Sequence, residues 1–269
     1  MDLSAYFKRI GYTEKPSADL YTLRELHYLH TTHIPFENLT PFTHREVSLE
    51  LPELEEKMIR GGRGGYCFEQ NLVFLHVLTA LGFTARGLSA RVLWNQPEEV
   101  VTRRSHMLIL VELAGVRYLA DVGFGGLTQT APLELTLGKE QKTTHEDFRI
   151  AELDGDFKLE ARVAAEWKTL YRFDLTRQFQ IDYEVANFFL YTHPTSLFRN
   201  TLIAAKPVEE GRYALSGNQL TFYPRSSVPI KTTLGTAAEV REVLTTKFGI
   251  HLQGLPDLDT RLESIFKEA

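Results

Sequence analysis

The first third of the chain has hydrophobic residues at helical spacing. Leucines at 20, 23, 26 and, less regularly, 29 form one stripe, which predicts a helix beginning near residue 17 with Ser17 as its N-cap. Pro35 disfavours helical geometry in the residue before it, so this helix should end there and residues 34–39 should form a turn. Pro52 fits the first turn of a second helix. A dense apolar run at residues 72–83 predicts a third helix that stops at Gly82.

The pattern changes after Gly82 from helical spacing to short, β-prone segments. Residues 105–113 and 116–122 flank Ala114-Gly115 and predict a hairpin, and Asp154-Gly155 is a strong signal for a second one. With further strands at 85–94 and 167–173, the middle of the chain predicts an antiparallel sheet, in the form of a small barrel. Residues 182–191 should be a helix closed by His193-Pro194.

The last part of the chain mixes the two patterns. Residues 202–205 and 213–222 are expected to be strands. Thr236-Ala-Ala-Glu239 is typical of a capping box and predicts a helix that stops at Gly249. A terminal helix should cover residues 255–267.

Composition narrows the classes of function. The net charge is −5 at pH 7, with 43% hydrophobic residues, which argues against a nucleic-acid partner. We find neither the pattern of a signal peptide nor an apolar run long enough to span a membrane. A single cysteine cannot form an internal disulfide and suits a reducing compartment. We therefore expect a cytoplasmic globular protein.

That single cysteine, Cys67, follows a stretch of glycines and arginines, Arg60-Gly-Gly-Arg-Gly-Gly-Tyr66, and precedes the apolar helix. A helix N-terminus carries partial positive charge, and a nearby arginine adds a full one, so both favour a thiolate. The alternative is a buried cysteine that serves as a small hydrophobic residue. The glycine-rich loop favours the nucleophile.

A nucleophilic cysteine needs a base, and the chain has nine histidines. His27, His30 and His33 have helical spacing that suggests a metal, but no cysteine or acidic cluster accompanies them, so a solvated helix face is the better interpretation and no metal is expected. His44, His145 and His251 have polar neighbours, which predicts surface positions.

His106 differs because the hairpin places it near an acid. A two-residue turn at 114–115 pairs residues whose numbers sum to 229, so position 108 faces Asp121 and His106 is its diagonal neighbour on the same face. On this pattern alone, it is equally plausible that His106 and Asp121 are simply solvent-facing positions of the two strands. With a candidate thiol, a Cys67–His106–Asp121 assembly is the leading hypothesis, in which Asp121 fixes the tautomer of His106 and His106 takes the proton of Cys67.

Asp121 runs into a glycine-rich turn, Val122-Gly-Phe-Gly-Gly126. Such a turn can present backbone N–H groups to a phosphate or a developing oxyanion. It lacks the lysine and the Ser/Thr of a Walker A loop, which argues against nucleotide hydrolysis.

Several of these segments together resemble the arylamine N-acetyltransferase family. Arg63-Gly-Gly-Tyr-Cys-Phe-Glu69 resembles its active-site signature, and Ile34-Pro-Phe-Glu-Asn-Leu39 resembles its proline-phenylalanine-glutamate-asparagine turn. Further matches follow in family order: Ser105-His106, Ala120-Asp121-Val-Gly-Phe-Gly125, Asp182-Tyr-Glu-Val-Ala-Asn187 and Thr192-His-Pro194. One departure is the doubled Arg-Gly-Gly, which leaves the role of Arg60 open.

The resemblance implies an α+β fold in three parts with a cysteine-protease-like Cys–His–Asp site. These are a helical bundle with the nucleophile loop (1–84), an antiparallel β-barrel with the histidine and aspartate (85–194) and a C-terminal α/β lid (195–269). It also implies acetyl transfer from acetyl-CoA to an aromatic amine, hydrazine or hydroxylamine through an acetyl-cysteine, with Cys67, His106 and Asp121 as the triad.

The resemblance also suggests residues around the triad. We expect Phe36, Phe68 and Phe124 to bind the substrate ring, although core packing explains each equally well. Gly125 and Gly126 are expected beside the substrate. Arg63 should pair with Glu37 and hold the nucleophile loop.

Two other functions use the same residues. A thiol hydrolase or transglutaminase-like enzyme would carry the same triad. A non-catalytic binder of aromatic ligands or CoA would carry an inert cysteine. The sequence leaves the oligomeric state open, including a homodimer.

Overall fold

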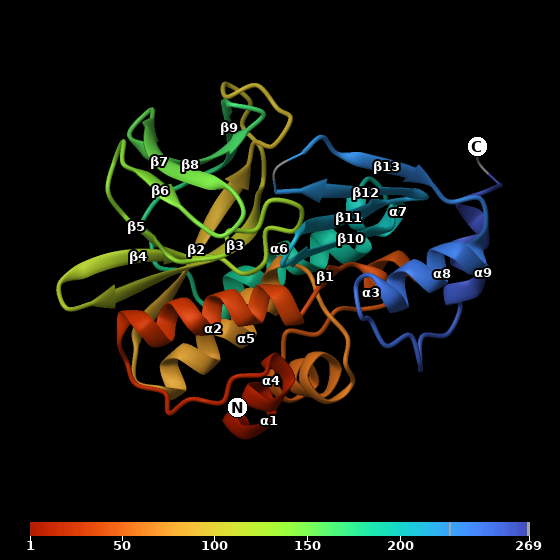
Figure 1. Ribbon diagram of the computed structural model, residues 1–269, viewed down its shortest axis with the longest axis horizontal. Coiled ribbons are helices and arrows are strands. Elements are labelled where there is room, and N and C mark those ends of the chain that lie inside the picture. Colours follow the sequence, from red (N-terminus) through yellow and green to blue (C-terminus); the bar gives the residue numbers. More distant parts are fainter. Residues whose placement is uncertain (226, 268–269) are drawn as a thin grey trace.

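The computed structural model describes residues 1–225 and 227–267, and its helices gather in the first third and the last third of the chain (Figure 1). The N-terminal helices are α1 (Leu3–Ile10), α2 (Leu20–His33), α3 (Leu39–Phe42), α4 (Leu51–Leu54), the π-helical turn η1 (Glu55–Arg60) and α5 (Cys67–Ala80). The N-cap of α2 is Asp19 and not Ser17, because the Asp19 carboxylate accepts the backbone N–H of Thr22 at 2.8 Å. The predicted end of α2 before Pro35 and the Pro52 start are confirmed.

Helix α5 is the centre of the N-terminal core. Most of its length is buried, from Cys67 to Leu78, and it packs against strands of the barrel. Gly82 follows it with φ +87°, a conformation that glycine adopts without strain, so the chain turns there into the first barrel strand.

The middle of the chain is an eight-stranded antiparallel sheet in the order β5-β4-β3-β2-β9-β8-β7-β6. The strands are β2 (Thr84–Val92), β3 (Arg104–Leu113), β4 (Val116–Ala120), β5 (Leu133–Glu134), β6 (Glu140–Lys142), β7 (Asp147–Leu153), β8 (Asp156–Val163) and β9 (Glu166–Phe173). The edge strands β5 and β6 meet through the side chain of Gln141, which accepts the N–H of Glu134 at 2.7 Å and donates to its carbonyl at 2.8 Å. The sheet is therefore a nearly closed barrel, and both predicted hairpins are confirmed.

The last third forms a second, five-stranded sheet in the order β1-β10-β11-β12-β13. Its strands are β10 (Ile203–Val208), β11 (Gly211–Ser216), β12 (Gln219–Pro224) and β13 (Ile230–Thr233), and its helices are α6 (Gln180–Thr192), α7 (Leu197–Asn200), α8 (Ala237–Thr246) and α9 (Leu258–Ser264). The single strand predicted at 213–222 is a hairpin, because Gly217 turns the chain with φ +57°. Helix α8 ends at Thr246, before the predicted stop at Gly249.

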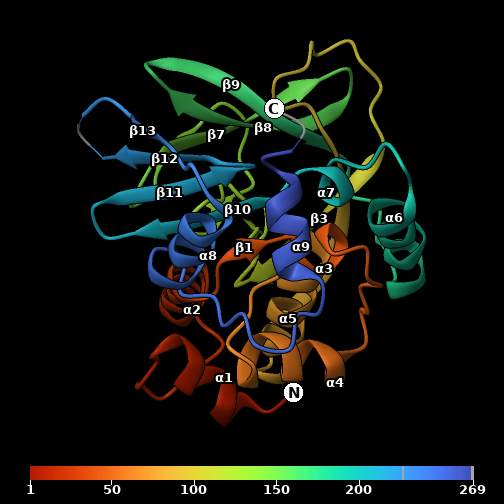
Figure 2. The same ribbon diagram turned by 90° about the vertical axis from the view of Figure 1, so that its right-hand side faces the viewer.

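The first strand of this sheet comes from the N-terminal third. β1 (Phe36–Glu37) pairs antiparallel with β10, with Phe36 opposite Ala205, so residues 34–39 contain more than the predicted turn. The turned view shows β1 at the lower edge of the C-terminal sheet and beside α3 (Figure 2). The division at residues 84 and 194 stays a prediction, and β1 ties the first part to the last.

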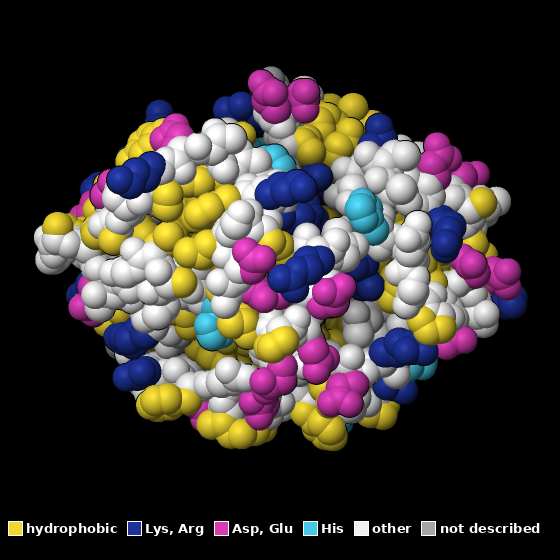
Figure 3. Space-filling model, turned by 90° about the horizontal axis from the view of Figure 1, so that it is seen from below, with side chains coloured by type: hydrophobic (Ala, Val, Ile, Leu, Met, Phe, Trp, Pro, Cys, Tyr) yellow, Lys and Arg dark blue, Asp and Glu magenta, His cyan; other side chains and the backbone are white. Residues whose placement is uncertain are grey.

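The surface shows no single-sign region on the face seen from below. There, basic and acidic side chains are interspersed, with apolar side chains between them (Figure 3). Within residues 1–225 and 227–267, every helix is too short or too polar to cross a membrane.

Candidate active site

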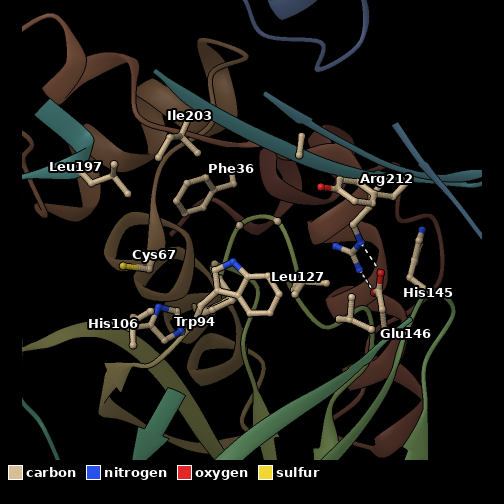
Figure 4. A pocket seen from close by; sticks show the side chains of 18 of the residues that line it. Phe36, Cys67, Trp94, His106, Leu127, His145, Glu146, Leu197, Ile203 and Arg212 are labelled. Atoms are coloured by element: carbon tan, nitrogen blue, oxygen red, sulfur yellow. Dashed lines mark hydrogen bonds and ion pairs between the residues drawn. The ribbon is translucent and has the colours of Figure 1, made fainter. Parts of the chain in front are cut away.

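A cavity of about 1410 Å³ lies where the N-terminal helices, the barrel and the C-terminal sheet meet. Cys67 and His106 are on one side of it, and His145, Glu146 and Arg212 are on the other, with Trp94, Phe36 and Leu127 between them (Figure 4). The cavity thus joins the predicted nucleophile to a long space with apolar and charged walls.

Cys67 is the first residue of α5, as the sequence predicts. The Glu69 carboxylate accepts the N–H of Tyr66 at 3.0 Å and is itself paired with Lys57 at 2.6 Å, so it fixes the first turn of the helix. The thiol lines the cavity and donates to the carbonyl oxygen of Ser105 at 3.6 Å. Strand β3 therefore holds both the contact of Cys67 and the neighbouring His106.

His106 and Asp121 are paired, as the hairpin geometry predicts. Leu113 pairs with Val116 across the turn, and Nε2 of His106 donates to Oδ2 of Asp121 at 2.7 Å. Asp121 lies just beyond the end of β4, which leaves it free to turn toward the histidine. Nδ1 of His106 is then the ring nitrogen left for Cys67.

Electrostatics favour a charged His106. Burial lowers the pKa of this imidazole, but the charge of Asp121 and hydrogen bonds to Asp121 and Cys67 raise it to about 10. Burial likewise raises the pKa of Asp121, yet His106 and hydrogen bonds from Asn71 and Gly123 lower it below its ordinary value. The site therefore keeps an imidazolium–carboxylate pair through the neutral pH range.

Asp121 has hydrogen-bond partners in addition to His106. Asn71 donates to Oδ1 at 3.0 Å and Tyr171 donates to Oδ2 at 3.0 Å. The N–H of Asp121 donates to Nε2 of His27 at 3.3 Å. Both oxygens of the acid therefore have fixed partners, which sets the orientation of the imidazole.

The prediction that these histidines form a solvated face of α2 is wrong. His27 and His30 are fully buried, because this side of α2 packs against Phe74 of α5. Burial lowers the pKa of His27 to about 3 and that of His30 to about 4, so both are neutral.

His145, predicted at the surface, is half-buried and donates to the carbonyl of Val208 at 2.8 Å. Across residues 1–225 and 227–267, no three His, Cys, Asp or Glu side chains gather to hold a metal.

Four of the five residues expected beside the substrate line the cavity: Phe36, Phe124, Gly125 and Gly126. The ring of Phe124 also stands edge-on to His106, with centroids 5.3 Å apart. Phe68 does not line the cavity; it is fully buried against Tyr66 and Tyr183. The reason is helical geometry, because a residue next to Cys67 on α5 points about 100° away from it.

Two glycines of the turn after Asp121 use their backbone amides internally. The N–H of Gly123 donates to Asp121 at 2.9 Å, and that of Gly125 donates to the hydroxyl of Thr128 at 2.6 Å. Neither of these two N–H groups is free for an oxyanion, and the expectation for the rest of the turn stays a prediction. Gly123 has a different role, since a Cβ there would lie 2.9 Å from Cα of Cys67. Its missing side chain lets the turn pack on the nucleophile.

The predicted pair of Arg63 and Glu37 is present. The guanidinium lies 2.7 Å from a fully buried Glu37 carboxylate, which also accepts the N–H of Leu39 at 2.6 Å. Arg60, by contrast, is half-exposed and pairs with Asp2 at 3.3 Å, outside the cavity. The two arginines of the doubled motif therefore lie in different environments.

Comparison with known proteins decides the family. Residues 19–256 match the model of a family described as N-acetyltransferase. An arylamine N-acetyltransferase of Mycobacterium tuberculosis H37Rv is 39% identical over 272 residues, which cover 98% of this chain and 96% of that protein. The chain belongs to the arylamine N-acetyltransferase family. The Escherichia coli K12 member is 38% identical over 249 residues, which cover 92% of this chain and 88% of that protein.

Solved structures of the family have the same fold. The Mycobacterium marinum arylamine N-acetyltransferase superposes with a TM-score of 0.95 at 36% identity, covering 98% of this chain and 99% of that one. A structure of the same M. marinum enzyme in complex with CoA superposes at 0.94, covering 99% of each chain.

Sequence reasoning missed part of the site of this family member. Asn71 could have been found, because it is one helical turn after Cys67 and so shares its face of α5. Tyr171 and Trp94 carry no comparable signal, since β9 pairs with β2 across some 80 residues of chain.

Proposed function

We propose that this chain transfers an acetyl group from acetyl-CoA to the nitrogen of an arylamine, arylhydrazine or arylhydroxylamine. The observation that carries the proposal is the Cys67–His106–Asp121 arrangement at an open cavity, in a chain of the arylamine N-acetyltransferase family. A named relative from Salmonella typhimurium is an arylamine N-acetyltransferase / N-hydroxyarylamine O-acetyltransferase, 34% identical over 249 residues.

The first half-reaction forms an acetyl-cysteine. Cys67 as thiolate, beside protonated His106, attacks the thioester carbonyl carbon of acetyl-CoA. The tetrahedral intermediate collapses, the bond from carbon to the CoA sulfur breaks, and His106 gives its proton to the departing thiolate. Asp121 keeps the imidazole in place throughout and stabilises its charged form.

The second half-reaction uses the amine. The neutral nitrogen of the acceptor attacks the acetyl carbonyl, its proton passes to His106, and the bond to the Cys67 sulfur breaks. The products are the amide and the original thiolate–imidazolium pair. Aromatic amines are neutral at pH 7 whereas most alkylamines are protonated, so amine basicity itself favours aromatic acceptors.

The cavity walls fit both substrates. Phe36 and Phe124 lie close enough to the reacting centre to contact a flat ring. Arg162 and Arg225 also line the cavity and carry charge for the phosphates of CoA. We infer that acetyl-CoA enters past these arginines with its thioester toward Cys67. A free thiol nucleophile needs a reducing compartment, which favours the cytoplasm.

Steady-state kinetics test the proposal. Varying an arylamine at several fixed acetyl-CoA concentrations should give parallel double-reciprocal lines, as a covalent intermediate requires. Cys67→Ser should lower kcat by about 10³-fold or more. Intersecting lines would contradict the acetyl-cysteine route. Acetyl-CoA consumption that is equally fast without amine would instead indicate a hydrolase.

A further inference from the structure

The cavity has a polar end away from Cys67, which the catalytic steps leave unused. Arg212, on β11, is 2% exposed and lines this end together with Glu146. Its Nε donates to Oε1 of Glu146 at 2.9 Å, and its Nη2 donates to the other carboxylate oxygen and to the carbonyl of Thr128. The chain itself therefore engages two of the three guanidinium nitrogens.

The third nitrogen, Nη1, is buried and has no partner among residues 1–225 and 227–267. A guanidinium is planar, so Nη1 points away from a carboxylate that Nε and Nη2 hold side-on. Figure 4 shows it turned toward the part of the cavity where Leu127 and Trp94 lie. A buried N–H group without an acceptor is destabilising, so the ion pair of Arg212 with Glu146 does not by itself account for this group.

The neighbouring His145 is already bonded at both ring nitrogens. Its Nε2 donates to the carbonyl of Val208 at 2.8 Å, and its Nδ1 lies 3.3 Å from the hydroxyl of Thr130. Burial and the charge of Arg212 lower the pKa of His145, so the ring is neutral at pH 7. The acceptor for Nη1 therefore has to come from the cavity.

One face of the C-terminal sheet connects this end of the cavity with the nucleophile. Phe36 pairs with Ala205, and Ala205 pairs with Ala214, so the three residues share a face. Arg212 is two residues before Ala214 on β11 and lies on that same face. Strand spacing puts the Cα atoms of Phe36 and Arg212 roughly 12 Å apart. The small side chains of the two alanines leave room for a flat ring over this part of the sheet.

We propose that Nη1 of Arg212 binds a ring substituent of the acceptor amine, and that this substituent is an uncharged carbonyl oxygen. The amine nitrogen then lies at the acetylated Cys67, the ring lies over Ala214, and the carbonyl accepts from Nη1. This inference rests on the proposed acetyl transfer and names the acceptors that the site prefers. They are aromatic amines that carry a ketone or amide group opposite to the nitrogen.

The charge of Glu146 selects a neutral oxygen over a carboxylate. Glu146 already neutralises Arg212, and a carboxylate at Nη1 would lie across one guanidinium from a like charge. A carbonyl oxygen meets no such repulsion and still receives a hydrogen bond from a charged donor.

The oxygen reaches Nη1 by displacing part of the cavity wall, because the atom itself is covered. Leu127 is half-buried, lines the cavity and precedes Thr128, whose carbonyl Arg212 binds. We expect the side chain of Leu127 to turn aside when such an acceptor binds.

Kinetics with two amines of similar shape test the proposal. The first, para-aminoacetophenone, has the carbonyl, and the second, para-isopropylaniline, has an apolar group in its place. In a ping-pong reaction, kcat/KM for the amine reports the step between acetyl-enzyme and amine, so the ratio of the two values measures acceptor preference. Arg212→Lys keeps a cation for Glu146 but lacks Nη1. It should lower the ratio about tenfold relative to wild type, a comparison in which the intrinsic nucleophilicities of the amines cancel.

Arg172→Lys is the matched control. Arg172, on β9, holds the carboxylate of Asp156 with the same two nitrogens, at 3.0 and 2.8 Å, and lies outside the cavity. This variant should leave the ratio unchanged. If the Tm of Arg212→Lys shows that it is poorly folded, the double variant Arg212→Met, Glu146→Met removes the ion pair and Nη1 together. It should show the same tenfold decrease.

Three results would overturn the subsite while acetyl transfer itself stands. A ratio that is unchanged in folded Arg212→Lys would show that Nη1 does not bind the acceptor. An equal loss of kcat/KM for both amines would leave Arg212 a purely structural role. A loss of kcat/KM for acetyl-CoA with an unchanged ratio would assign the arginine to the donor. A wild type that acetylates neither amine would overturn the proposed function, and this inference with it.

Discussion

Asn71 and Asp121 are joined by a hydrogen bond of 3.0 Å from the amide nitrogen to Oδ1, which links the nucleophile helix to the acid. Asn71 also donates to the carbonyl of Met107 at 2.8 Å, and its own oxygen accepts the N–H of Val122 at 3.1 Å. One side chain on α5 therefore ties together the residues that follow His106 and Asp121.

Replacing Asn71 should impair catalysis more than folding. Asn71→Ala removes one of the two N–H donors to Oδ1 of Asp121 and leaves the N–H of Val122 without its acceptor, and a buried unmade hydrogen bond costs about 1–3 kcal/mol. We expect kcat/KM for an arylamine to fall about 10- to 100-fold. Thr79→Ala, on the exposed end of the same helix, should leave it unchanged. Equal activity of Asn71→Ala and wild type would refute this role.

The fit of the glycine turn against Cys67 predicts a sharp difference between two glycines. A Cβ at Gly123 would lie 2.8 Å from the Asn71 amide and 3.0 Å from the carbonyl oxygen of Cys67. Gly123→Ala should therefore displace the turn and lower Tm by several degrees. Gly126→Ala is the control, because nothing lies within 4 Å of its Cβ position. Differential scanning calorimetry measures the Tm of both variants. Similar decreases in Tm would show that close packing at Gly123 is not the cause of the destabilisation.

Substitutions of the two arginines of the doubled motif should differ in their effect on the stability of the protein. Arg63→Met leaves the Glu37 carboxylate buried without its partner, at a cost of about 3–5 kcal/mol. Arg60→Met, at a half-exposed position, should cost less than about 0.5 kcal/mol. Urea unfolding at pH 7 measures both. If the two losses are alike, the buried ion pair does not hold the loop.

The same pair predicts a dependence on pH. Burial raises the pKa of Glu37, but Arg63, Lys57 and the N–H of Leu39 together lower it below the ordinary 4.5. In the wild type, the stabilisation from this group is present above pH 4.5 and is lost as the pH falls through the lower native pKa. Arg63→Met removes the main cause of that lowering, so the Glu37 carboxyl of the variant takes up a proton more readily. The loss in free energy of unfolding of Arg63→Met relative to wild type should therefore shrink as the pH falls from 7 to 5.

His106 predicts how the reactivity of Cys67 varies with pH. Because its pKa is about 10, the imidazolium faces the thiol through the neutral range. The rate of alkylation by iodoacetamide should change little from pH 8 to 6, whereas an ordinary thiol slows about tenfold per pH unit. In His106→Gln the charge is gone, and the steep dependence should return. A steep profile in the wild type would favour an inert cysteine and a binding function.

The paired His106 and Asp121 could be predicted because the interaction is local. A two-residue turn at Ala114-Gly115 fixes which residues face each other, and the observed pairing of Leu113 with Val116 follows from it. Cys67 at the start of α5 could be predicted for a similar reason, since loop and helix are adjacent in sequence. Both relationships span few residues.

The errors concern relationships between distant segments. His27 and His30 were expected in solvent, but tertiary packing buries them: Tyr6 and Gln70 satisfy His30 at 2.8 and 2.7 Å. Strand β1 has only two residues, and its partner β10 lies far along the chain, so no local pattern reveals it. Phe68 is expected to bind the substrate ring, but it follows Cys67 on α5, and neighbours on a helix face different ways.

The central claim is that Cys67 carries the acetyl group. The most direct test is the intact mass of the protein after mixing with acetyl-CoA alone, with wild type beside Cys67→Ala. We predict that only the wild type gains one acetyl group and that adding an arylamine removes it as the N-acetyl product forms. No gain in the wild type, or an equal gain in Cys67→Ala, would contradict the acetyl-cysteine mechanism.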